Sequence, residues 1–241
     1  MTSDQPTQVA APEAIDLPSS LTRADWLRMA SGFSKLLWSI PLGLLLFTGA
    51  ISLRWPPLIQ LPSYIVAAAL YFWGLLILRK VTPFSPAWSH SLRMALLLGF
   101  LLFYFSPFIY WWERRPLIDH LSVNVFALVF TVTWILWTIN TLVEVISNQL
   151  NDKVFMIEAR LCRWSVGLFM IIPLLVFLIL STLRASQHGV PLAQFLHNLL
   201  YARHAYLLFA GFVMPMTLTL TMIWRTKKRS IAQVIAEENR S

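Results

Sequence analysis

The sequence predicts an all-α integral membrane protein with six transmembrane helices, both termini in the cytoplasm and amphipathic interfacial helices. Three observations predict this class. The 241-residue chain is 57% hydrophobic and only 12% charged, with a mean hydropathy of +0.64, whereas about a quarter of the residues of a soluble domain are charged. It contains six apolar stretches of about 20 residues, the length that crosses the hydrocarbon layer. Its basic residues collect on one side of those stretches.

The six stretches are the predicted spans, and they must be helical because lipid offers backbone groups no hydrogen-bond partner. They are 36–53, 59–78, 91–112, 121–141, 164–183 and 205–224, and together they define a transmembrane domain over 36–225. The even number of spans places both termini on one side. Residues 1–20 are polar and contain three prolines, so they are predicted to be a disordered cytoplasmic terminus and not a signal peptide.

The distribution of basic residues predicts the orientation. Of the 19 lysines and arginines, five fall on the side opposite the termini: Arg54, Arg114, Arg115, Arg184 and Arg203. The excess on the other side places both termini in the cytoplasm, in a chain predicted to lie in a bacterial inner membrane. The net charge of +8 is therefore a feature of topology, and nucleic-acid binding is excluded. At the outer end of the third span, Trp111 and Trp112 are predicted to belong to an interfacial aromatic belt.

Segments at the cytoplasmic side have amphipathic patterns of their own. Residues 21–35 are predicted to form an interfacial helix, capped by Thr22 or Ser20, and residues 226–241 a basic tail that contacts anionic lipid. The linker 142–163 carries an apolar stripe at helical spacing, so the fourth span is predicted to continue out of the bilayer or to turn along its surface. The stripe is predicted to pack on the protein's own cytoplasmic helix ends or on lipid, or to dock another subunit. The stripe consists of Val143, Ile146, Leu150, Val154, Ile157 and Leu161.

Histidines on the predicted outer side are the candidate ligands for a haem or a transition metal. The stretch "HNLLYARH" places His197 and His204 on one helical face, but about 10.5 Å apart, which is too far for one ion to bind both. The metal candidates are thus His120, His197 and His204, and a haem between two helices would use His120 with His204. The alternative is an amphipathic helix that lies on the outer leaflet with these polar side chains facing water.

Catalytic signatures are absent from the sequence. It contains no G-x-S-x-G, H-E-x-x-H or G-x-x-x-x-G-K-[ST] motif, and its single cysteine excludes a cysteine-rich cluster. We therefore expect a non-catalytic accessory or scaffold subunit of a membrane assembly, whose partners are the lipid bilayer and other membrane subunits or a second copy. A permease or channel for a small neutral solute is the first alternative, motivated by Pro215 and the threonines that follow it. A haem- or metal-binding membrane protein is the second.

Overall fold

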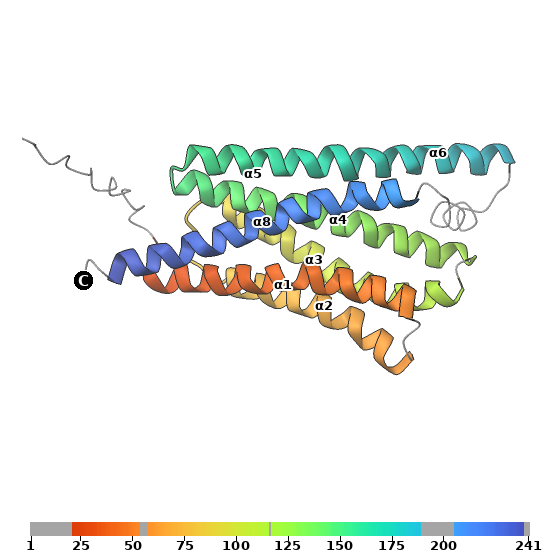
Figure 1. The fold of residues 1–241 in the computed structure, drawn as a ribbon, viewed down its shortest axis with the longest axis horizontal. Helices are drawn as coiled ribbons and strands as arrows, with labels where there is room; N and C mark the ends of the chain where they lie inside the picture. The colour runs from red at the N-terminus through yellow and green to blue at the C-terminus, as the bar shows by residue number, and fades with distance from the viewer. Residues whose placement is uncertain (1–20, 54–56, 116, 189–204, 239–241) are drawn as a thin grey trace, which may run out of the picture.

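The computed structural model describes residues 21–53, 57–115, 117–188 and 205–238, and no strand occurs in these ranges. The helices are α1 (Arg23–Leu53), α2 (Pro57–Leu78), α3 (Pro86–Arg114), α4 (Asp119–Gln149), α5 (Lys153–Val166), η1 (Gly167–Ile171), α6 (Ile172–His188) and α8 (Ala205–Glu238). Helices α5, η1 and α6 follow one another without a gap and form one rod, which we call the α5–α6 rod (Figure 1).

The helices run alternately back and forth along one axis, so that α1 begins and α8 ends at the same end of the bundle (Figure 1). We call this end, at the left of Figure 1, the basic end, because most of the lysines and arginines lie there. Chain neighbours pack on each other: α1 on α2, α2 on α3, α3 on α4 and α4 on α5. Helix α8 packs on α1, α4 and α5, so the last helix joins the first.

Three helical segments are long and apolar enough to cross a membrane. They are Pro86–Arg114, Asp119–Gln149 and Lys153–Val176. These segments contain or overlap the third, fourth and fifth predicted spans, so an all-helical chain with three helices long and apolar enough to cross a membrane is confirmed for the described residues. At 1.5 Å per residue, the 31 residues of α4 extend over about 46 Å. This exceeds the hydrocarbon thickness of about 30 Å, so α4 is longer than one membrane crossing requires.

The largest buried side chains gather at the basic end. Trp26, Met29 and Phe33 of α1 are all at most 1% exposed and belong to the main apolar cluster with Trp88 and Phe155. The apolar face of residues 21–35 is therefore covered by the other helices, and α1 continues without a break into the first predicted span. Thr22 caps α1 as predicted, because its hydroxyl accepts the backbone N–H of Asp25 at 3.3 Å.

Helices α1 and α2 approach each other closely at two glycines. A Cβ atom at Gly32 would lie 2.7 Å from Cγ of Leu78 and 3.1 Å from the carbonyl oxygen of Gly74. A Cβ atom at Gly74 would in turn lie 3.0 Å from the carbonyl oxygen of Gly32. Only a residue without a side chain leaves room for this contact, a common device where membrane helices pack.

The linker 142–163 is interrupted by a turn. Helix α4 ends at Gln149, and α5 begins at Lys153. Asn151 between them has a φ of 52°, a left-handed conformation that asparagine tolerates better than most residues. Asp152 then caps α5, since its carboxylate accepts the backbone N–H of Phe155 at 2.9 Å. Helix α4 therefore continues past the end of the fourth predicted span to Gln149, and a tight turn then leads into α5.

The α5–α6 rod contains one turn of π-helix where a proline would otherwise break it. Proline at 173 supplies no backbone N–H and clashes with the carbonyl four residues earlier in a regular helix. The wider turn relieves this conflict, and the N–H of Ile172 bonds to the carbonyl of Gly167 instead. Gly167 also permits close packing, because a Cβ atom there would lie 3.0 Å from the Trp137 ring.

Candidate functional site

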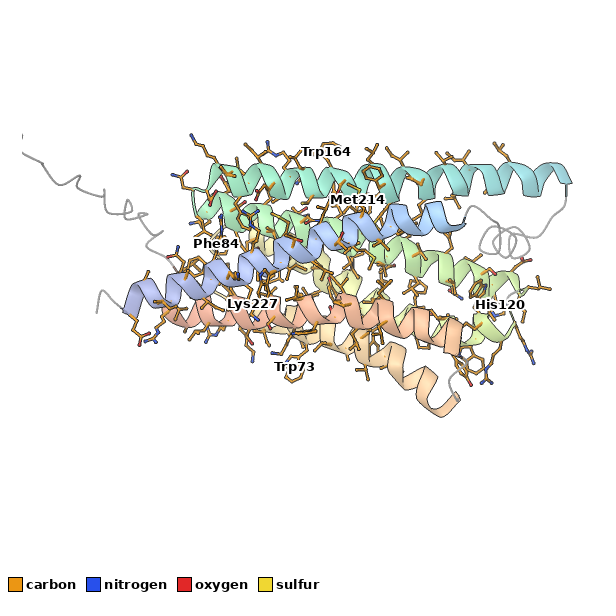
Figure 2. All side chains as sticks on the ribbon, viewed as in Figure 1. Trp73, Phe84, His120, Trp164, Met214 and Lys227 are labelled. Carbon is orange, nitrogen blue, oxygen red and sulfur yellow. The ribbon has the colours of Figure 1, made fainter. Side chains whose placement is uncertain are left out.

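Of the histidines predicted to bind a metal or haem, only His120 lies among the described residues. It is exposed in the first turn of α4, at the end of the bundle opposite the basic end (Figure 2). His197 and His204 lie outside the described residues, so their pairing with His120 stays a prediction. Within the described ranges, no three histidine, cysteine or carboxylate side chains gather in a way that would hold a metal ion.

The hollow beside His120 is basic and aromatic. It has a volume of about 560 Å³, and its lining combines two arginines, His120 and aromatic rings, with no carboxylate: Tyr110, Trp111, Arg114, Arg115, Ile118, His120 and Leu121. Such a lining suits an anion better than a metal cation. Arg114 stacks over the Tyr110 ring at 4.3 Å. Of the two tryptophans predicted to lie in an interfacial aromatic belt, Trp111 is exposed. Trp112 is instead buried, and its indole N–H donates to the Ser122 hydroxyl of α4 at 3.1 Å.

The turn at Asn151 divides the predicted apolar stripe into two parts with different surroundings. Val143, Ile146 and Leu150, which are in or next to α4, are 0–6% exposed and belong to the bundle core. In α5, by contrast, Val154 is 65% exposed, Ile157 53% and Leu161 63%. The first half therefore packs on the protein's own helices, as one interpretation of the stripe predicted. Only the second half, which we call the α5 patch, remains available to a partner.

The threonines that motivated the permease hypothesis serve helix packing. Asn140 of α4 is fully buried, and its amide donates to the Thr219 hydroxyl of α8 at 2.9 Å. Thr219 donates to the Pro215 carbonyl, and Thr217 and Thr221 bond to carbonyls of their own helix. Thr217 and Thr221 are exposed on the outside of the bundle. These contacts fix α4 against α8 and add no support for a solute pathway, which stays a hypothesis.

Ion pairs hold α5 between α4 and α8 at the basic end. Glu144 of α4 lies 3.1 Å from Arg160 and 2.7 Å from Arg163. On the other side, Arg225 pairs with Glu158, and Arg229 pairs with Asp152. Burial disfavours the ionised form of Asp152, but the Phe155 N–H and the Arg229 guanidinium outweigh it, so the pKa of Asp152 lies below its usual value.

Phe155 lies under the same arginines. Its side chain is fully buried, and the guanidinium carbons of Arg229 and Arg225 lie 4.0 Å and 5.5 Å from its ring centroid. The ring therefore fills the core and also supports the two cations that pair with α5. Sequence reasoning missed this arrangement, because no periodic pattern links α5 to the charges of α8.

A second polar junction at the basic end is centred on Asp25, which is only 1% exposed. Its carboxylate accepts the Thr22 hydroxyl at 2.9 Å, the backbone N–H of Thr82 at 3.3 Å and the Arg28 guanidinium at 3.2 Å. Arg28 also donates to the Lys80 carbonyl at 3.2 Å. One buried carboxylate thus joins the start of α1 to the turn between α2 and α3.

Asp25 is expected to make the fold acid-sensitive. Burial raises its pKa, but the hydrogen bonds from Thr22 and Thr82 lower it more, so its pKa lies below the usual 3.8. A carboxyl group whose pKa is lowered by folding stabilises the fold above its unfolded pKa, and this contribution is lost as pH falls through the folded pKa. Between about pH 5 and pH 3, Tm should therefore fall more steeply for the wild type than for Asp25→Asn.

The matched control is Glu238→Gln, which removes a carboxylate from an exposed pair with Arg23. This variant should follow the wild-type profile of Tm against pH. Equal slopes for the wild type and Asp25→Asn would show that Asp25 contributes no acid sensitivity.

The described residues therefore combine a tightly packed basic end, an exposed α5 patch and a basic hollow beside His120. Comparisons of the chain with protein-family models, with curated proteins and with solved structures found no match.

Proposed function

We propose that this chain is a non-catalytic accessory or scaffold subunit of a membrane protein assembly, with six spans in a bacterial inner membrane. The basic end would face the cytoplasm, in accord with the excess of lysines and arginines there. The alternating helix directions in Figure 1 support an arrangement in which both termini lie on that side. On this proposal the bundle anchors a surface that another membrane subunit recognises.

The proposal rests on the position of the α5 patch along the long axis of the bundle, close to the basic end (Figure 1). An apolar face that lies in lipid needs no protein partner. The α5 patch, however, lies in the first turns of α5, beside charged side chains. Asp152, Glu158 and Arg160 all form ion pairs there. Charged side chains mark these turns as lying at or beyond the membrane surface, where an exposed apolar patch is a protein-interaction feature.

The patch continues along the outer face of the rod. Large apolar side chains face outward at intervals of three or four residues: Val154, Ile157, Leu161, Trp164, Leu168, Ile172, Leu175 and Ile179. Trp164, labelled in Figure 2, is 60% exposed, and its ring also packs edge-on against the Trp137 ring of α4 at 6.0 Å. A partner helix could therefore pack along one continuous apolar seam.

The proposal predicts that polar substitutions in the α5 patch release a partner without unfolding the chain. In Ile157→Ser with Leu161→Ser, a protein that co-purifies with the wild type in mild detergent should be lost. Tm should change little, because both side chains are exposed. The measurement is quantitative mass spectrometry of the purified material beside its Tm.

The matched control is Leu27→Ser with Ile231→Ser, two exposed apolar side chains of α1 and α8 near the same end. This control should retain the partner. A wild-type protein that purifies as a lone protomer, with no stoichiometric companion, would contradict the proposal.

A further inference from the structure

A second basic hollow lies at the end of α2. It has a volume of about 460 Å³ and is lined by Trp73, Leu76, Ile77, Arg79 and Lys80. Arg79 and Lys80 are exposed where α2 ends, and neither forms an ion pair among the described residues. Two cations beside an apolar wall form an environment that attracts an anion with an apolar body.

A third cation lies at the rim of this hollow. The Lys35 ammonium of α1 is 5.1 Å from the Trp73 ring centroid and 3.2 Å from the Ser31 hydroxyl. Trp73 is itself 58% exposed, and Figure 2 shows it projecting away from the bundle. An exposed tryptophan beside basic side chains is typical of the headgroup layer of a membrane.

The wall of the hollow continues as an apolar strip along α2. Val66, Ala69, Trp73 and Leu76 are all exposed and are spaced three, four and three residues apart, so they share the outward face. The strip leads from the apolar part of α2 to Arg79 and Lys80. This order matches a phospholipid, with acyl chains along the strip and a negative headgroup at the cations.

We infer that this hollow binds one phospholipid with an anionic headgroup, whose phosphate lies among Lys35, Arg79 and Lys80. The inference rests on the placement of the basic end at the cytoplasmic membrane surface. The backbone at Lys80 is held in place by the Arg28 guanidinium, which donates to its carbonyl at 3.2 Å. The carbonyl contact leaves the Lys80 ammonium free to bind the lipid while the end of α2 stays fixed.

The test uses the delipidated full-length protein in detergent and native mass spectrometry with phosphatidylglycerol or phosphatidylcholine. The wild type should retain one phosphatidylglycerol in preference to phosphatidylcholine. Arg79→Gln with Lys80→Gln should weaken phosphatidylglycerol binding by about 30-fold, because each basic group near an anionic lipid contributes about fivefold. The control pair, Arg93→Gln with Lys153→Gln, removes two exposed cations from α3 and α5 and should keep wild-type binding within about twofold.

Three results would overturn the inference. The first is equal weakening in the two double variants, which would indicate attraction by net charge alone. The second is equal retention of the two lipids by the wild type. The third is displacement of the lipid by inorganic phosphate at equal concentration, which would indicate an anion site without acyl-chain recognition. The experiment measures lipid binding by the isolated protein. A negative result would therefore contradict the lipid inference without bearing on whether the chain binds a protein partner.

Discussion

Phe155→Ala is expected to destabilise the protein by about 3–5 kcal/mol, the usual cost of removing a fully buried phenylalanine. The ring is 0% exposed, so its loss leaves a cavity in the main apolar cluster. It also removes the surface under Arg225 and Arg229, which pair with Glu158 and Asp152. For a chain of this length, Tm should fall by about 10 °C, as measured by thermal unfolding in a fixed detergent.

Ile157→Ala is the matched control, because Ile157 lies in the same helix and is 53% exposed. Its effect on the free energy of unfolding should stay within about 0.5 kcal/mol. If Phe155→Ala and Ile157→Ala lowered Tm equally, the basic end would not be the packed core that the burial of Phe155 indicates.

Gly32→Ala is expected to cost about 1–3 kcal/mol through overpacking of α1 against α2. The added methyl group would lie 2.7 Å from Cγ of Leu78, whose side chain is fully buried. It would also press on the Gly74 carbonyl. Helix propensity acts in the opposite direction, since alanine is favoured over glycine by about 1 kcal/mol within a helix.

Gly43→Ala separates these two effects. Among the side chains that the structure describes, a Cβ atom at Gly43 would meet only that of Ala67, at an ordinary 3.8 Å. This variant should unfold at the wild-type temperature or slightly above it, while Gly32→Ala unfolds below it. The reverse order of Tm values in thermal unfolding would show that α1 and α2 are not in close contact at Gly32.

Three of the six predicted spans contain or overlap helices that are long and apolar enough to cross a membrane, because the length of an apolar run is a strong local signal. The position of the turn between α4 and α5 was not predicted, although its chemistry was visible. Asn151 and Asp152 are the residue types that accept a left-handed conformation and cap a helix. They were overlooked because the apolar spacing of three or four residues continues across them, so the pattern shows no break at the turn.

The candidate site was only partly predictable, because periodicity identifies an apolar face and not what covers it. Val143 and Val154 belong to the same sequence pattern, yet Val143 is fully buried and Val154 is 65% exposed. The pairs that join α8 to α5 connect residues far apart in the chain, as Glu158 and Arg225 show. Such contacts depend on which helices become neighbours, and a single sequence carries no local record of that.

The contact of the last helix with the first has a consequence for the order of synthesis. Met222, Ile223 and Val234 of α8 belong to the same apolar cluster as Phe33 and Phe155. Until the ribosome has translated these residues, the nascent chain has an open seam between α1 and α5. The basic end therefore reaches its final packing only after α8 has been translated, and the seam is closed by a segment of the same polypeptide.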